Sequence, residues 1–183
     1  MTIEPPLYAE IVEFWRDAGP KLWFARNNAF DGVLRDRFEA VQLAAGRGDY
    51  ADWVDTAEGA LALVLLLDQF PRNLYRHTPQ AFATDPLARE TASEALARGH
   101  DQATDRSLRA FFYMPFEHAE DPADQDRAVA LMQALGDADY LRYAELHREV
   151  IRRFGRFPHR NAILGRESTE GEIAYLAGPG FKG

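Results

Sequence analysis

The sequence predicts an all-α protein, a single domain of seven to eight antiparallel helices that spans residues 1–183. Three observations support this fold class. Apolar residues recur at helical spacing along almost the whole chain. No segment shows a convincing strand pattern. Proline and glycine stand between the periodic segments, where helices usually begin and end. With 183 residues, 46% of them apolar, the chain is long enough to bury one full core.

The first two helices are predicted from apolar stripes. A stripe over residues 8–15 indicates a helix that ends at the Gly-Pro pair of residues 19–20. A second stripe over residues 30–41 stops at the Gly-Arg-Gly segment of residues 46–48. Both patterns are typical of helices that bury one face.

The most apolar segment is residues 56–69, TAEGALALVLLLDQ. It is apolar on nearly every side, which predicts a buried central helix. Pro71 disfavours helical geometry in the residue before it, so we expect this helix to end by about Phe70.

Two Asp-Pro pairs, at residues 85–86 and 121–122, predict further helix starts. In each pair the aspartate would be the N-cap and the proline would occupy the first helical position. The predicted helices run to about Arg98 and to about Leu135.

Two more helices are predicted at the C-terminal end. Residues 137–154 form a long amphipathic pattern that ends at Gly155, a residue suited to the left-handed position after a helix. Thr169 and Glu172 have the spacing of a capping box and predict a last short helix.

Composition excludes several classes of function. The net charge of -8 disfavours binding to nucleic acid or to an anionic membrane. The longest apolar run, residues 60–67, is far shorter than the roughly twenty residues that span a membrane. The chain has no cysteine, so it has no disulfide and no thiolate metal site. We therefore expect a cytoplasmic protein that binds neither nucleic acid nor membrane.

Polar residues gather in three segments between the predicted helices. The first polar turn is residues 66–77, LLDQFPRNLYRH, with Asp68, Arg72 and Asn73 after the most apolar helix. Arg72 suits the negative end of that helix. A capping or salt-bridge pair between Asp68 and Arg72 explains the same pattern equally well.

The second polar turn is residues 111–121, FFYMPFEHAED. His118 is a candidate general base, because histidine titrates closest to neutral pH, and Glu120 could assist it. Asp121 should be used as a helix cap. A core histidine bonded to a carbonyl is an equally good interpretation of His118.

The third polar turn is residues 153–169, RFGRFPHRNAILGREST. It contains Arg156, His159, Arg160, Asn161 and Arg166, and its Phe-Pro-His-Arg-Asn repeats the pattern Phe-Pro-Arg-Asn of the first polar turn. His147 lies on the apolar face of the preceding helix. Arginine binds carboxylate or phosphate through two parallel hydrogen bonds, and a buried arginine without a partner is costly. Internal acids or a bound anion must therefore pair these arginines.

Other chemistries lack their usual motifs. The chain has no HExxH or Glu-x-x-His pair for a metal, no glycine-rich phosphate loop and no GxSxG nucleophile. We predict no metal and no cofactor.

Four segments carry a resemblance to a known family: LLDQFPRNLYR, AFATDPLA, YMPFEHAEDPADQ and RFGRFPHRNAILGRESTEGE. In this order they closely resemble the bacterial family called domain of unknown function 924, over residues 23–176. The resemblance implies a tetratricopeptide-like helical array. The family has no established activity, so the resemblance assigns no catalytic residue and leaves open whether the protein is an enzyme. The chain departs from the family pattern at Ala119, where serine is expected, and at Gly171, where proline or an acid is expected.

Three hypotheses of function remain. In the first, the three polar turns face one pocket for an anionic small molecule: Arg72, Arg156 and Arg160 hold a carboxylate or phosphate, Asn73 and Asn161 orient it, and His118 with Glu120 transfers protons. In the second, the helices form an adaptor whose concave face binds a peptide or protein. In the third, Asp68, Glu120 and Asp121 neutralise the arginines and lock the helix ends.

Overall fold

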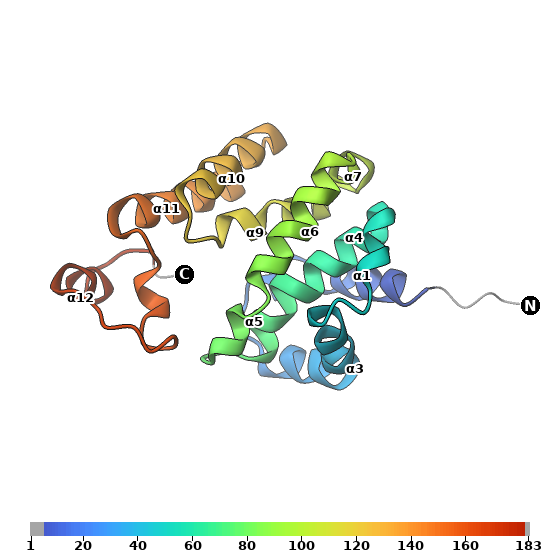
Figure 1. The fold of residues 1–183 in the computed structure, drawn as a ribbon, viewed down its shortest axis with the longest axis horizontal. Coiled ribbons are helices and arrows are strands. Elements are labelled where there is room, and N and C mark those ends of the chain that lie inside the picture. Colours follow the sequence, from blue (N-terminus) through green and yellow to red (C-terminus); the bar gives the residue numbers. More distant parts are fainter. Residues whose placement is uncertain (1–5, 182–183) are drawn as a thin grey trace, which may run out of the picture. The chain divides into compact units, whose positions relative to one another are not determined.

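The computed structural model describes residues 6–181, which are helical with short connections and no β-strand (Figure 1). Seven helices in that range have eight residues or more: α1 (Leu7–Ala18), α3 (Asn28–Gly46), α4 (Ala57–Val64), α6 (Asp85–Ala97), α10 (Pro122–Leu135), α11 (Ala138–Phe154) and α12 (Glu170–Ala177). Shorter helical segments are α2 (Pro20–Trp23), η1 (Ala51–Asp55), η2 (Leu65–Gln69), α5 (Phe70–Leu74), η3 (Pro79–Phe82), α7 (His100–Ala103), α8 (Arg106–Arg109), η4 (Ala110–Phe112), α9 (Met114–Glu117) and η5 (Pro158–Arg160). The prediction of an all-α fold is confirmed, and the tetratricopeptide-like arrangement stays a prediction.

The chain divides into two compact units. Unit 1 comprises Met1–Arg76 and Gln80–Phe112, and unit 2 comprises His77–Pro79 and Tyr113–Gly183. Unit 1 contains the first polar turn almost entirely, whereas the second and third turns lie mainly in unit 2. The prediction of one domain over residues 1–183 stays a prediction.

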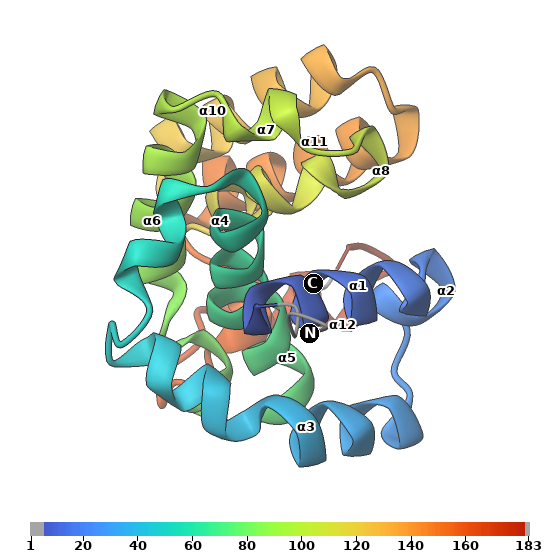
Figure 2. The ribbon, with the colours of Figure 1, turned by 90° about the vertical axis from the view of Figure 1, so that its right-hand side faces the viewer.

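Unit 1 is built on the predicted central helix. In Figure 2, α4 and α5 follow one another along one helical rod, joined through η2. All residues from 59 to 71 are buried, as expected for a segment that is apolar on nearly every side. Aromatic rings pack against the rod: Trp15 of α1 lies 5.4 Å from Phe70 and 5.6 Å from Phe111 between ring centroids.

The prediction that Pro71 ends this helix is wrong. The chain continues as a helix to Leu74 because a widened turn, η2, precedes the proline. In this π-helical turn the Phe70 N–H donates to the Leu65 carbonyl, five residues back. Proline has no N–H to donate to the Leu67 carbonyl. The hydroxyl of Thr84 donates to that carbonyl instead, at 2.6 Å.

The start of α6 also differs from the prediction. We expected Asp85 to be the N-cap, but the helix begins at Asp85 and Thr84 takes the cap position. The physical reason is that both side chains are used elsewhere. The Thr84 hydroxyl bonds to Leu67, and the carboxylate of Asp85 accepts hydrogen bonds from Arg72 at 2.9 and 3.1 Å.

Unit 2 begins with α9 and the hairpin of α10 and α11, which lie side by side in Figure 1. Asp121 caps α10 as predicted, with its Oδ1 accepting from the N–H groups of Ala123 and Asp124. Gly155 ends α11 with a φ of 71°, the left-handed conformation that glycine tolerates best. Thr169 and Glu172 form both hydrogen bonds of the predicted capping box.

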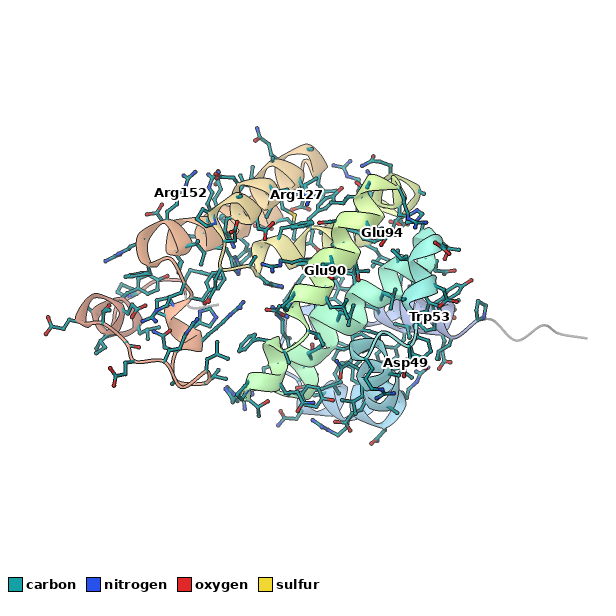
Figure 3. All side chains as sticks on the ribbon, in the orientation of Figure 1. Asp49, Trp53, Glu90, Glu94, Arg127 and Arg152 are labelled. Carbon is teal, nitrogen blue, oxygen red and sulfur yellow. The ribbon has the colours of Figure 1, made fainter. Side chains whose placement is uncertain are left out.

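Many arginines outside the polar turns form exposed ion pairs. Glu90 and Glu94 project from α6 in Figure 3, and Arg98 donates to Glu94 at 2.6 Å. Arg152 of α11 similarly donates to Asp126 at 2.9 Å. Exposed pairs of this kind contribute little stability.

None of the helices in the described part of the chain combines the length and apolar character required of a membrane-spanning helix.

A first prediction concerns the Leu67 carbonyl, which accepts a hydrogen bond from the Thr84 hydroxyl. Thr84→Val keeps the side-chain shape but leaves the Leu67 carbonyl without its hydroxyl donor. We expect the free energy of unfolding to fall by about 1–3 kcal/mol, measured by urea denaturation. Thr84→Ser keeps the donor and should lose less. Equal losses in the two variants would contradict this explanation of the continuous helix.

A second prediction compares two glycines at which an added Cβ should change stability in opposite directions. Gly155→Ala should reduce stability by about 1 kcal/mol, because an added Cβ is strained at a φ of 71°. Gly32→Ala is the matched control, since Gly32 lies within α3 and a Cβ there meets nothing within 4 Å. It should raise stability by about 0.5–1 kcal/mol. Thermal unfolding of both variants checks these opposite signs, and destabilisation by both would contradict them.

Candidate functional site

Buried Gln125 of α10 fixes the backbone of the second polar turn. Its Nε2 donates to the carbonyls of Glu117 at 2.6 Å and Ala119 at 2.8 Å. These contacts hold the chain on both sides of His118 where α9 ends. The family-like segment YMPFEHAEDPADQ therefore contains both the turn and the side chain that shapes it.

Glu120 connects the second polar turn to the third. Its carboxylate accepts from the Phe157 N–H at 2.7 Å and from both terminal nitrogens of Arg166 at 2.6 and 2.9 Å. Burial acts to raise the pKa of Glu120, but these hydrogen bonds and the nearby positive charges lower it below its usual value. Glu120 is therefore ionised at neutral pH and holds the two turns together.

Asn161 extends this network inside the third polar turn. Its Oδ1 accepts from Arg166 Nε at 2.9 Å, and its Nδ2 donates to the Ser168 hydroxyl at 3.0 Å. Asn161 is buried, and the two ends of its amide connect the side chains of Arg166 and Ser168.

Arg156 pairs with an acid of its own chain. Its Nε and Nη2 donate to the two carboxylate oxygens of Glu172, at 2.7 and 2.8 Å. The Thr169 N–H also donates to Glu172, at 2.7 Å. The hydrogen bond from Arg156 is the main cause that lowers the pKa of Glu172 to about 2, although burial acts in the other direction. The carboxylate that caps α12 thus also binds Arg156.

Two histidines and one arginine lie against the ring of Phe157, and a third histidine, His118, lies beside them. The ring lies 5.6 Å from His147 and 5.5 Å from His159 between centroids, and the Arg160 guanidinium lies 4.6 Å from its centre. The ring centroids of His118 and His147 lie 6.0 Å apart. The backbone carbonyl of His118 accepts a hydrogen bond from Arg160 at 3.0 Å. We call His118, His147, His159 and Arg160 the histidine cluster.

The cluster creates a positive environment around His159. Burial is the largest cause that lowers the pKa of His159 to about 4, and the nearby charge of Arg160 is the next largest. His147 and His118 also lower this pKa, whereas Glu120 raises it. His159 is therefore neutral at pH 7 and can donate or accept a hydrogen bond.

His147 is anchored by an acid that sequence reasoning missed. Its Nδ1 lies 2.9 Å from a carboxylate oxygen of Glu117 and 2.8 Å from the Tyr143 carbonyl. Glu117 is only 5% exposed, so this contact is shielded from water. Helical periodicity did predict that His147 points inward. Nothing in the sequence pairs it with a glutamate thirty residues earlier.

The first polar turn forms its own network in unit 1. Arg72 donates to both oxygens of Asp85 and lies 3.2 Å from Asp68, which is fully buried. Asn73 donates to Asp31 at 2.8 Å, and Arg76 binds both oxygens of Asp31. Asp31 and Asp85 come from distant segments, and sequence reasoning did not include them.

The predicted site residues are thus divided between the two units. His118, Glu120, His147, Arg156, His159, Arg160, Asn161 and Arg166 lie in unit 2, whereas Asp68, Arg72 and Asn73 lie in unit 1. Contacts within unit 2 bring the second and third polar turns together. The prediction that all three turns face one pocket stays a prediction.

The chemistry available in unit 2 is anion binding and proton transfer. A guanidinium and neutral imidazoles can donate hydrogen bonds to a carboxylate or phosphate, and a neutral imidazole can accept a proton. Across residues 6–181, histidine and acidic side chains form no group of three or more that could hold a metal ion.

Comparisons with known proteins agree with the family-like segments. Residues 11–180 match the family described as bacterial protein of unknown function (DUF924). A solved structure from Agrobacterium tumefaciens, described as protein of unknown function ATU0120, is 55% identical to this chain with a TM-score of 0.91. The match covers 93% of this chain and 96% of that one. No curated protein matches. The chain therefore belongs to the DUF924 family of bacterial proteins of unknown function.

Proposed function

We propose that the histidine cluster binds an anionic small molecule through its carboxylate or phosphate group. The observation that carries this proposal is the packing of Arg160, His147 and His159 against Phe157, with His118 next to His147. Burial is the largest cause of the low pKa of His159, and the second cause, the charge of Arg160, would also attract an anion.

Access to the cluster comes through its two partly exposed members. His118 and His159 have intermediate exposure, whereas Arg160 is 6% exposed. A ligand oxygen would meet the imidazole N–H groups first, with the charge of Arg160 behind them. Charge-assisted hydrogen bonds of this type are stronger in a partly buried site than in water.

An enzymatic role through acid–base chemistry is part of this proposal. His118 is the predicted proton-transfer residue with Glu120 as its helper, and an imidazole beside a bound anion suits that role. The contacts of Glu120 with Arg166 and Phe157 give it a second task, because they hold the third polar turn against the second. Binding of a peptide or protein partner and a cytoplasmic location also stay predictions.

A structural role is the second candidate for the remaining arginines. Arg72, Arg156 and Arg166 each donate two hydrogen bonds to a carboxylate of the same chain. These pairings favour Arg72 and Arg156 as locks on helix ends rather than as ligand clamps. Removing one partner of such a buried pair leaves the other charge uncompensated.

A third prediction tests anion binding. Inorganic phosphate should raise the melting temperature of the protein more than chloride at equal ionic strength, because a ligand that binds the folded state stabilises it. Arg160→Gln should weaken the phosphate affinity at least about tenfold in isothermal titration calorimetry. Acetate in a parallel titration separates carboxylate from phosphate preference.

Two further variants keep this test interpretable. Arg152→Gln makes the same charge change at an exposed residue and should keep the wild-type affinity. His159→Gln should also weaken phosphate binding. Because His159 is less buried than Arg160, this variant replaces Arg160→Gln in the test if Arg160→Gln does not fold. Phosphate binding that is absent, or equal in all four proteins, would overturn the proposal.

A fourth prediction concerns acid stability through Glu172. The folded-state pKa of about 2 lies below the ordinary value of 4.5, so the stabilisation is complete above about pH 5 and is lost as the pH falls toward 2. Glu172→Gln should remove roughly 1–2 kcal/mol at pH 7, a value reduced for solvent near Arg156, and should flatten this pH dependence. Urea denaturation at pH 3, 5 and 7 measures it. An unchanged slope would show that the pair contributes nothing.

A further inference from the structure

We infer that His147 is the member of the cluster that takes up a proton when an anion binds, and that buried Glu117 is its positioning residue. This assignment rests on the proposed function for the identity of the ligand. It differs from the pairing of His118 with Glu120 that the sequence predicts.

The surroundings of His147 Nδ1 fix where its proton lies. The Tyr143 carbonyl at 2.8 Å and the Glu117 carboxylate at 2.9 Å can only accept hydrogen bonds. Nδ1 must therefore carry the hydrogen. In the neutral ring this leaves the lone pair on Nε2, which is the atom that can accept a proton.

Glu117 also stabilises the product of that transfer. When Nε2 accepts a proton, the ring becomes a cation, and the carboxylate 2.9 Å from Nδ1 compensates its charge. A carboxylate that orients an imidazole and stabilises the imidazolium is the arrangement used by general bases in many enzymes. Glu117 does this through His147 and does not contact the ligand itself.

The other charged and titratable groups around His147 favour this residue, over His118 and His159, as the proton acceptor. They are Glu117 and His118 at the end of α9, His159 and Arg160 in η5, and Tyr140 beside Glu117 on α11. Burial is the main cause that raises the pKa of Tyr140 to about 12, so it stays neutral. Burial, together with the charge of Arg160, lowers the pKa of His159 and keeps it neutral. Glu117 is the carboxylate in direct contact with an imidazole of the cluster.

The proton that His147 takes up comes from the buffered solvent. Binding of a fully ionised oxyanion brings negative charge to the cluster, His147 Nε2 accepts one proton, and the acid form of the buffer becomes its conjugate base. The ligand is then held by an imidazolium and the Arg160 guanidinium. A proton held at Nε2 can be returned to a leaving group, which is the step that a hydrolase or transferase acting on an anionic substrate would need.

Two measurements test this inference. Long-range proton–nitrogen NMR of the unliganded protein should show His147 with hydrogen on Nδ1. Sulfate carries no proton near neutral pH, so calorimetric titration with sulfate in two buffers of different ionisation enthalpy counts the protons that the protein takes up. We expect Glu117→Gln to reduce that uptake at least twofold and Glu117→Asp to retain more of it.

The controls separate a positioning role from a structural one. Glu172→Gln removes another buried carboxylate of unit 2 and should leave proton uptake at the wild-type value. Hydrogen on His147 Nε2, or equal uptake in wild type and Glu117→Gln, would overturn the inference. If sulfate and phosphate both fail to bind, the proposed function fails, while the NMR result still decides whether Glu117 sets the form of His147.

Discussion

The contact between Glu120 and Arg166 is the interaction on which the candidate site depends. It joins two segments 46 residues apart in the sequence, and the same carboxylate accepts the N–H of Phe157. Phe157 is fully buried, and His147, His159 and Arg160 all lie against its ring. If Glu120 lost its charge, the buried ring and the side chains around it would lose their fixed position.

The polar turns of the two units provide hydrogen-bond partners for the backbone groups at helix ends in different ways. A chain that leaves a helix exposes backbone carbonyls and N–H groups that need partners. In unit 1 the partners come from Thr84 and Arg72, which allow the helix to continue past Pro71. In unit 2 the carboxylates of Glu120 and Glu172 accept both backbone N–H groups and arginine. Arginine is suited to these positions because its planar group forms two hydrogen bonds at once.

Local sequence rules predicted most of the fold. The helix starts at Asp121 and Thr169 and the helix end at Gly155 were read correctly, since each depends on a few neighbouring residues. The helix end at Pro71 was predicted wrongly, because the hydroxyl that compensates for the proline comes from Thr84. A partner thirteen residues away is invisible to a rule that considers adjacent positions.

The candidate site shows the same limit. Sequence patterns identified the residues of the polar turns, and helical spacing placed His147 on an inner face. They could not show that Asp85, Glu117 and Glu172 would be the acids in contact with Arg72, His147 and Arg156. Those pairings depend on how the helices pack, and many acids in this chain of net charge -8 were available as partners.

The contacts show that carboxylates hold Arg72, Arg156 and Arg166, and we propose that the histidine cluster binds an anion. Titration of isotope-labelled protein with phosphate, followed by NMR of backbone and side-chain nitrogens, tests this division of roles most directly. The largest shifts should occur at His118, His147, His159 and Arg160. Shifts centred on Arg72 or Arg156, or no saturable shifts, would contradict it.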